Sequence, residues 1–256
     1  MLKVDLNADL GESFGAYRLG REEEVLSEVT SANVACGFHA GDPVVLDRTL
    51  ALARARGVSV GAHPGYPDLM GFGRREMRVS PDEAYAYVLY QLGTFAAFAR
   101  AHGLAVQHLK AHGALYNTAG RDMALAMAVC RAVKDFDPHI ILLGLSGSRL
   151  MEAAGELGLP FASEIFADRA YEEDGSLVAR TKPGAMIEDE HEAIRRVIRM
   201  VKEGKVTAIS GRDVDVRADS VCVHGDGPKA LEFTRRIRQA LAAEGVELAP
   251  LGDFIR

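Results

Sequence analysis

Short apolar segments alternate with amphipathic helical segments along almost the whole chain. The apolar segments, which predict strands, cover residues 3–10, 31–36, 58–62, 105–112, 140–145, 160–167, 206–209 and 220–223. Helical periodicity lies between them, over residues 21–29, 44–56, 81–102, 121–134, 148–156, 188–203 and 228–244. Such alternation predicts a parallel sheet covered by helices. Because neither G-x-G-x-x-G nor G-x-x-x-x-G-K-[ST] occurs, about seven strands in a distorted (β/α) barrel are favoured over a dinucleotide-binding sheet.

Length and composition predict one α/β domain that spans residues 1–256. With 256 residues, 48% of them hydrophobic, the chain can bury a full core, and α/β barrels of this size are commonly undivided. The net charge of −6 argues against nucleic acid and anionic membranes as partners. No apolar run approaches the ~20 residues that span a bilayer, and no secretory signal precedes the first strand. Three cysteines without C-x-x-C spacing predict reduced, buried thiols in a cytoplasmic protein.

The first strand is polar on one of its two faces. Successive strand residues point to opposite faces, so Val4, Leu6 and Ala8 share the apolar face. The other face carries Asp5, Asn7 and Asp9. Later strands also end in His, Asp or Lys followed by Gly, and we therefore expect the strand ends to converge on one pocket that has this polar face as a wall.

Four of the eight histidines lie at or just after the carboxyl ends of predicted strands, namely His39, His63, His112 and His224. A single histidine at such a position is commonly a hydrogen-bonded structural residue. Four of them, from four strands, favour a functional site, because active sites of (β/α) barrels form at the carboxyl ends of the strands.

Lys110 lies inside a predicted strand, where it shares a face with His108 and His112. An unpaired ammonium in a barrel interior costs several kcal/mol, so Lys110 needs an anionic partner or a lowered pKa. We expect that partner to be Asp9. A purely structural Lys–Asp pair that ties two strands together is the alternative interpretation.

The same pocket is predicted to hold more carboxylates than one lysine can neutralise: Asp5, Asp9, Glu164 and Asp226. Some of them must be protonated, or a cation must enter. Asp9, His39 and His63 form a reasonable mixed N/O ligand set for a divalent metal with an open position for water. No compact ligand motif such as H-E-x-x-H supports this metal site.

Two further features suit an anionic substrate. The segment H-G-D-G-P at 224–228 precedes a predicted helix, and its backbone N–H groups could bind a carboxylate or phosphate, although its glycines could equally serve only the turn. Arg74, Arg75 and Arg180 lie on long predicted loops, where a guanidinium can hold a substrate carboxylate through two hydrogen bonds. Surface solvation explains any single one of these arginines equally well.

Six blocks of the sequence form long and specific motifs. They read V-D-L-N-A-D-L-G-E-S-F-G (4–15), S-A-N-V-A-C-G-F-H-A-G-D-P (31–43), G-A-H-P-G-Y-P-D (61–68) with G-F-G-R-R (71–75), L-K-A-H-G-A-L-Y-N (109–117), F-A-D-R-A-Y (166–171) and V-C-V-H-G-D (221–226). These blocks resemble the signature segments of the LamB/YcsF family, whose members are A subunits of bacterial ATP-dependent 5-oxoprolinases. The resemblance covers essentially the whole chain, in order.

The resemblance implies a distorted (β/α) barrel similar to polysaccharide deacetylase domains. It also implies opening of the 5-oxoproline (pyroglutamate) lactam to L-glutamate, coupled to hydrolysis of ATP to ADP and phosphate. The protein would work in a complex with two other subunits, B and C. ATP would be a co-substrate of this complex and would bind together with Mg²⁺. The chain itself shows no recognisable ATP motif, and homo-oligomerisation is compatible with its sequence.

This chemistry assigns roles to the pocket residues. Asp9 or a strand-end histidine is expected to act as general base for water, and Lys110 to stabilise the oxyanion or the phosphate. The histidines that position water and protonate the departing ring nitrogen are expected to be His39, His63, His112 and His224. The residues expected to bind substrate or orient the others are Asn7, Glu12, Arg74, Glu164 and Asp226.

Two other classes of function remain open at this point. One is a stand-alone metal-dependent deacetylase or amidohydrolase, which chelator-sensitive activity of the lone chain would support. The other is a non-catalytic protein that delivers substrate to the B and C subunits or regulates them. In that case, variants of the pocket would keep substantial turnover.

Overall fold

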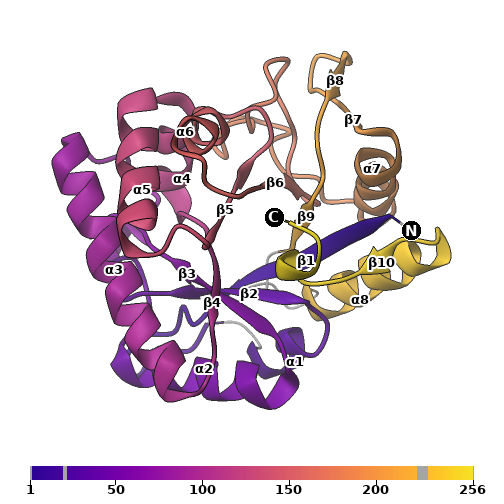
Figure 1. Ribbon diagram of the computed structural model, residues 1–256. Helices are drawn as coiled ribbons and strands as arrows, with labels where there is room; N and C mark the ends of the chain where they lie inside the picture. The colour runs from indigo at the N-terminus through magenta and orange to yellow at the C-terminus, as the bar shows by residue number, and fades with distance from the viewer. Residues whose placement is uncertain (1, 20–21, 224–229, 256) are drawn as a thin grey trace.

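Seven parallel strands close into a barrel in the computed structural model, which describes residues 2–19, 22–223 and 230–255 (Figure 1). The barrel strands are β1 (Lys3–Leu10), β2 (Ser31–Ala35), β3 (Ser59–His63), β4 (Val106–Leu109), β5 (Ile141–Leu145), β6 (Phe161–Phe166) and β9 (Ser220–Val223). They pair in this order, and β9 pairs in turn with β1, which closes the barrel. The predicted distorted barrel of about seven parallel strands is confirmed.

Helices connect these strands and pack on the outside of the barrel (Figure 1). They are α1 (Glu22–Leu26), α2 (Pro43–Arg56), α3 (Pro81–Ala101), α4 (Gly113–Arg121), α5 (Met123–Phe136), α6 (Arg149–Leu157), α7 (Glu190–Glu203) and α8 (Ala230–Ala243), with the 3₁₀ turns η1 (Leu69–Gly71) and η2 (Leu251–Asp253). Local signals set several ends: Ser80 and Glu83 form a capping box at the start of α3, and Gly57 ends α2 at a φ of 67°. Within the described ranges, no helix is both long enough and apolar enough to cross a membrane.

Two predicted strands differ in the structure, and one helix and two further strands were not predicted. The fourth strand ends at Leu109 instead of residue 112, and α4 begins almost directly after it, where no helix was expected. Helix α4 escaped prediction because its first residue, Gly113, is a poor helix former with a φ of 55°. The predicted strand at 206–209 is β7 (Lys205–Thr207), which pairs antiparallel with β8 (Asp213–Asp215) outside the barrel. A last short strand, β10 (Glu247–Leu248), pairs with the beginning of β1.

The interior of this barrel is polar, whereas the layer between strands and helices is apolar. Val4, Leu6 and Ala8 of β1 belong to the main hydrophobic cluster. The alternate residues Asp5 and Asn7 are fully buried and bond to side chains of other strands across the interior. The interiors of (β/α) barrels are usually filled by branched apolar side chains. Buried polar groups must be hydrogen-bonded to be stable, so this interior has to be a connected network.

Candidate active site

Lys110 is the central positive charge of the barrel interior. Its Nζ atom lies 2.7 Å from Glu164 Oε1 and 3.0 Å from Asp9 Oδ1. Lys110 and Glu164 are buried, whereas the side chain of Asp9 keeps 14% exposure. Burial by itself lowers the pKa of Lys110, but the surrounding groups, Asp9 foremost, outweigh it and hold this pKa well above its usual value. The structure thus places Lys110 against Asp9, as expected, and adds Glu164 as a second partner.

Two asparagines connect this charge cluster to the neighbouring strands. Asn7 Nδ2 donates to Glu164 Oε1 at 3.0 Å and to Ser220 Oγ at 2.7 Å. Asn33 Nδ2 donates to Asn7 Oδ1 at 2.7 Å and to Asp9 Oδ1 at 2.8 Å. Asn33 was not among the predicted site residues, although the period-two alternation that singled out Asn7 in β1 applies equally to β2.

Asp5 lies deeper in the barrel, where hydroxyl groups surround it. Its Oδ1 accepts hydrogen bonds of 2.6 Å from both Thr30 and Ser31, and its Oδ2 accepts one of 2.5 Å from Ser220. Burial raises the pKa of Asp5 to about 6, against the opposing effect of the hydroxyl donors. These contacts tie β1 to the beginnings of β2 and β9, which gives Asp5 a structural role.

His108 is a buried neutral member of the same network. Its Nε2 lies 2.6 Å from Asn33 Oδ1, and its Nδ1 lies 3.2 Å from Gln107 Nε2. The Gln107 amide donates to Nδ1, so Nε2 carries the proton that Asn33 accepts. Burial, followed by the charge of Lys110, lowers the pKa of His108 to about 3. The sequence placed His108 on the face of Lys110 but assigned it no function.

Three of the four predicted strand-end histidines meet at the mouth of this interior. His39 follows β2, His63 ends β3 and His112 follows β4. The rings of His39 and His112 stack with centroids 3.6 Å apart, and His112 Nδ1 lies 3.0 Å from His63 Nε2. Burial, followed by the neighbouring histidines, lowers the pKa of His39 and of His112 well below its usual value. The other predicted residues at this mouth, His224 and Asp226, lie outside the described residues.

Two carboxylates face these histidines. Glu12 Oε1 lies 3.3 Å from His39 Nε2 and 3.5 Å from His112 Nδ1, and Asp9 Oδ2 lies 3.4 Å from His63 Nε2. One ligand atom from each of Glu12, His39, His63 and His112 lies within 4.8 Å of the other three, which is close enough to hold a metal ion. The predicted ligand set of Asp9, His39 and His63 is thereby enlarged by Glu12, which the sequence placed only as an orienting residue, and by His112.

The loop after β3 presses against the histidines from one side. Asp68 holds this loop, because its carboxylate accepts from the backbone N–H of Gly71 and from Nε of Arg75, both at 2.9 Å. Gly73 has a φ of 63°, and a Cβ atom there would lie 2.7 Å from His39 Cβ and 2.8 Å from His112 Cδ2. Only glycine fits this position, because the backbone is left-handed and no space is left for a side chain.

The three predicted loop arginines have different surroundings. Arg75 is committed to Asp68 and stabilises the loop, so it is not free to clamp a substrate. Arg74 is exposed, with its guanidinium 4.9 Å from the ring centroid of Phe72, next to the histidines. Arg180 is also exposed, and its Nη1 lies 3.6 Å from Met186 Sδ.

All three cysteines are buried and free of disulfides, as the sequence predicted. Burial raises the pKa of Cys36 to about 12 and that of Cys222 well above its usual value. Cys222 Sγ lies 3.2 Å from Lys110 Nζ. A thiol with a raised pKa is a poor nucleophile, so Cys222 serves as a weak acceptor for Lys110.

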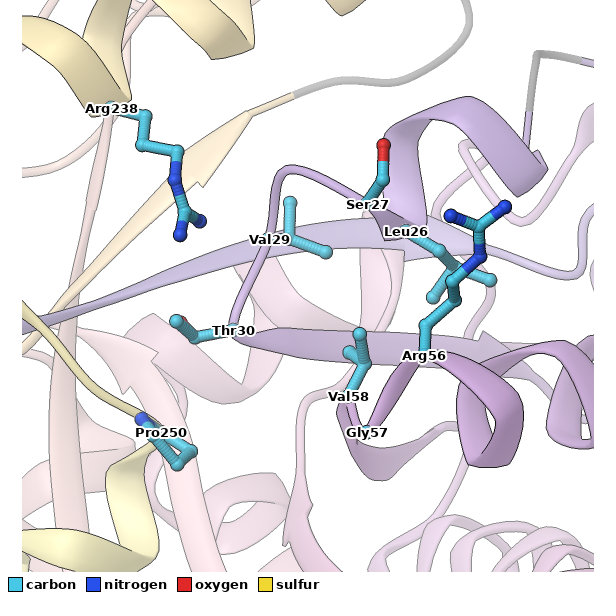
Figure 2. A pocket seen from close by; sticks show the side chains of 9 residues that line it. All are labelled: Leu26, Ser27, Val29, Thr30, Arg56, Gly57, Val58, Arg238 and Pro250. Atoms are coloured by element: carbon cyan, nitrogen blue, oxygen red, sulfur yellow. The ribbon is translucent and has the colours of Figure 1, made fainter.

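Two cavities lie at the opposite end of the barrel from the histidines. One of about 350 Å³ is formed at the beginnings of β2 and β3, and the side chains of Arg56 and Arg238 reach its rim (Figure 2). Arg56 pairs with Glu23, and Arg238 donates to the carbonyl of Glu28. The other, of about 650 Å³, lies beside the beginnings of β4 and β5. Catalytic residues of (β/α) barrels come from the opposite, carboxyl ends of the strands.

The histidine mouth combines groups that can move protons and activate water. Asp9 and Glu12 supply carboxylate oxygens next to the imidazoles of His63 and His112, and Lys110 contacts Asp9 from the barrel interior. The lowered pKa of His112 keeps this imidazole neutral near pH 7. Neutral imidazoles accept protons or bind metals, and ionised carboxylates act as general bases. The arrangement therefore suits hydrolysis of an amide-like bond by water.

Comparisons with known proteins identify relatives of this chain and support its fold. The LamB/YcsF family model matches residues 4–256. A relative from Clostridium beijerinckii, described as the A subunit of 5-oxoprolinase, is 62% identical over 251 residues, which is 98% of each chain. The crystal structure of a lactam utilization protein from Thermus thermophilus has a TM-score of 0.92 and 52% identity, and the match covers 97% of this chain and 99% of that one.

A more distant structure shares the fold at low sequence identity. A mutant of a CE4 (family 4 carbohydrate esterase) pseudoenzyme has a TM-score of 0.52 at 11% identity, over 98% of this chain and 66% of its own. The expected similarity to polysaccharide deacetylase barrels is thus confirmed at the level of the fold alone. The full-length match to the family model and the high identity to the Clostridium protein carry the assignment further. The chain belongs to the LamB/YcsF family.

Proposed function

We propose that this chain is the component of an ATP-dependent 5-oxoprolinase that opens the lactam ring of 5-oxoproline to L-glutamate. The observation that carries the proposal is the carboxylate of Asp9, which Lys110 holds at 3.0 Å while its second oxygen faces His63 at 3.4 Å. The identity of the substrate is inferred from relatives described as the A subunit of 5-oxoprolinase, such as the Clostridium protein. The word subunit in that description supports a complex with partner proteins, for which we take the B and C subunits.

The chemistry explains why ATP is needed. A five-membered lactam is a poor electrophile, because attack on its carbonyl carbon destroys amide resonance. Transfer of the γ-phosphoryl group of ATP to the lactam oxygen gives ADP and activates this carbon. Water then adds to the carbon, and the C–N bond breaks as the ring nitrogen takes a proton, which leaves an acyl phosphate. A second water hydrolyses the acyl phosphate, so that 5-oxoproline, ATP and two molecules of water give glutamate, ADP and phosphate.

We assign the proton transfers to the residues of the mouth. Asp9 removes the proton from the attacking water, because its Oδ2 faces the mouth while Lys110 and Asn33 occupy its Oδ1. Protonated Asp9 then passes this proton to the leaving nitrogen, because a metal bound at His63 and His112 would leave neither imidazole free to carry it. Lys110 is buried and already surrounded by acceptors, so we assign it to keeping Asp9 ionised and oriented. Contact between Lys110 and the phosphoryl group is less favoured by this burial.

The ATP site is assigned to the partner subunits, with Mg²⁺ accompanying the nucleotide. This follows from the lack of a G-x-x-x-x-G-K-[ST] sequence in the chain. A divalent metal at the histidine mouth also belongs to the proposal. Free, buried cysteines support a reducing compartment, for which we propose the cytoplasm.

The test is 5-oxoproline-dependent release of ADP and glutamate, measured for the chain alone and for the chain with its B and C partners. Asp9→Asn should lower the turnover of the complex by about 10²- to 10⁴-fold, the usual contribution of a general base. Asp253→Asn, at an exposed position in η2, is the matched control and should leave turnover unchanged. Near-normal turnover of the Asp9 variant would show that this pocket takes no part in the chemistry, as in a protein that only delivers substrate.

The cluster of Glu12, His39, His63 and His112 also favours a second candidate, a metal-dependent amidohydrolase or deacetylase that works alone. The same assay separates the two. Chelator-sensitive hydrolysis of an amide or acetyl substrate by the lone chain, without ATP, would support the second candidate and contradict the first.

A further inference from the structure

The protonation of two histidines at the mouth is determined by backbone carbonyl groups. His63 Nδ1 lies 2.7 Å from the carbonyl oxygen of Lys110, and His112 Nε2 lies 2.9 Å from that of Phe72. A carbonyl oxygen can only accept, so both of these nitrogens carry the hydrogen. The remaining atoms, His63 Nε2 and His112 Nδ1, then present lone pairs to each other at 3.0 Å. Two facing lone pairs repel, unless a proton or a metal cation lies between them.

The distances around these two nitrogens match the edges of a metal coordination shell. Metal–nitrogen and metal–oxygen bonds of about 2.0–2.1 Å in a tetrahedral zinc site place neighbouring ligand atoms ~3.3 Å apart. The edges here are 3.0 Å between the two histidines and 3.5 Å from His112 Nδ1 to Glu12 Oε1. Side chains held together only by hydrogen bonds would pair a donor with each acceptor. Here, the lone pairs of two histidines face each other and a carboxylate oxygen of Glu12.

The geometry of His39 distinguishes it from the ligands. Its ring is parallel to that of His112 within 3°, at a centroid distance of 3.6 Å. An imidazole lone pair lies in the plane of its ring, and two parallel planes do not meet at one ion. His39 Nε2 instead lies 3.3 Å from Glu12 Oε1, where it can donate a hydrogen bond that orients this carboxylate. His39 is therefore a positioning residue.

The loop after β3 is strained in a way that supports this arrangement. In the described part of the chain, Phe72 is the one non-glycine residue with a positive φ, at 55°. This strained residue provides the carbonyl that fixes the hydrogen on His112. Backbone strain of this kind costs about 1–3 kcal/mol and concentrates at functional sites. Metal-binding histidines almost always donate their second N–H to such an acceptor.

We propose that His63 Nε2, His112 Nδ1 and Glu12 bind one divalent transition-metal ion such as Zn²⁺, with water as the fourth ligand. Two imidazoles and a carboxylate are ligands that Zn²⁺, Co²⁺ and Mn²⁺ accept, and three protein ligands leave one position of a tetrahedral site to water. This ligand set differs from the one predicted from sequence, because His112 and Glu12 replace Asp9 and His39. When bound, such an ion polarises a carbonyl or acidifies a water molecule. A role of the ion in lactam opening rests on the proposed function, whereas its binding does not.

The first experiment is a titration of the chelator-treated intact chain with Zn²⁺ alone and with Co²⁺ alone. We expect about one ion per chain, and an intense visible Co²⁺ spectrum that reports a four-coordinate site. A metal content below about 0.1 ion per chain under excess Zn²⁺ would overturn the proposal.

Variants test the ligand assignment. His112→Gln and Glu12→Gln should weaken Zn²⁺ binding by about 100-fold or more, since even loss of an outer partner costs 10- to 100-fold. His139→Gln and Glu156→Gln, both exposed and distant in sequence from the site, are matched controls and should bind Zn²⁺ like the unmodified chain. His39→Phe keeps the stacked ring, so it should weaken binding by about 10- to 100-fold with an unchanged Co²⁺ spectrum. Equal affinity in His112→Gln and His139→Gln, with both variants folded by circular dichroism, would refute the ligand set.

Failure of this proposal can be told apart from failure of the proposed function. Stoichiometric Zn²⁺ binding in a complex that does not turn over 5-oxoproline would leave the metal site standing and remove the function. Full turnover in a complex in which this chain binds no Zn²⁺ would support the function and remove the metal site.

Discussion

Replacing Lys110 by Met removes the positive charge from the barrel interior while keeping a side chain of similar length. Two carboxylates then lose their counter-charge: Glu164, which is fully buried, and Asp9, whose side chain is 14% exposed. Breaking a buried ion pair in this way costs about 3–5 kcal/mol of the free energy of unfolding. Because Lys110 bridges two carboxylates at 2.7 Å and 3.0 Å, we expect a loss toward the upper end of this range.

A second substitution shows whether charge is the cause. In the double variant Lys110→Met/Glu164→Gln, one of the two uncompensated carboxylates is neutral, and the amide can still accept from Asn7 as Glu164 Oε1 does. The double variant should therefore be more stable than Lys110→Met, with a coupling energy of about 1–3 kcal/mol. A cavity or packing defect left by Lys110 would not be repaired by this change.

The assay is urea unfolding of the isolated chain, followed by circular dichroism, together with turnover of the reconstituted complex. The slope of the unfolding free energy against urea should stay the same, so that a shift of the midpoint reports stability. The reasoning would be refuted if Lys110→Met cost less than about 1 kcal/mol and Glu164→Gln gave no recovery. Turnover should fall by orders of magnitude in Lys110→Met, because Asp9 loses the partner that holds it.

Three further predictions follow from the same geometry. Asp5 has a pKa of about 6 in the folded chain against 3.8 ordinarily, so the folded state holds this proton more tightly and the contribution of Asp5 to stability falls as the pH rises from about 4 to about 6. This contribution amounts to roughly 3 kcal/mol. In Asp5→Asn, the difference between the free energies of unfolding in urea at pH 4 and at pH 7 should therefore be smaller by this amount. An equal pH dependence of stability in the two chains would contradict the assignment. Gly73→Ala should lower stability by about 2–4 kcal/mol and impair turnover, because it adds a clash with His39 and His112 to the backbone strain; Gly147→Ala, also at positive φ but with no atom within 4 Å, should cost only about 1–2 kcal/mol and leave turnover intact. In the native chain at pH 8, a thiol reagent should label none of Cys36, Cys130 and Cys222, because all three are buried, whereas the urea-unfolded chain should label at all three; rapid labelling of Cys222 by mass spectrometry would show that the barrel interior is open to solvent.

Local periodicity was sufficient for the fold class and for the polar wall of the pocket. The alternation of Asp5, Asn7 and Asp9 with apolar residues is a property of consecutive positions, because strand side chains alternate whatever the strand packs against. Helix signals such as the Ser80–Glu83 capping box are local in the same sense. The pairing of Lys110 with Asp9 could be expected from charge alone, since an ammonium inside a barrel needs an anion.

Only the tertiary structure decided which atoms of these residues face each other. Glu164 is the closer partner of Lys110, and Glu12 contacts both His39 and His112. These contacts could not be predicted, because they depend on how distant strands are aligned. The hydrogen on His112 is fixed by the carbonyl of Phe72, 40 positions away in the sequence. No local pattern contains such a contact, because distances between segments arise when the barrel closes. The sequence alone therefore determined which residue types line the pocket. The closure of the barrel set the distances between their side chains, on which the proposed proton transfers and the proposed metal site depend.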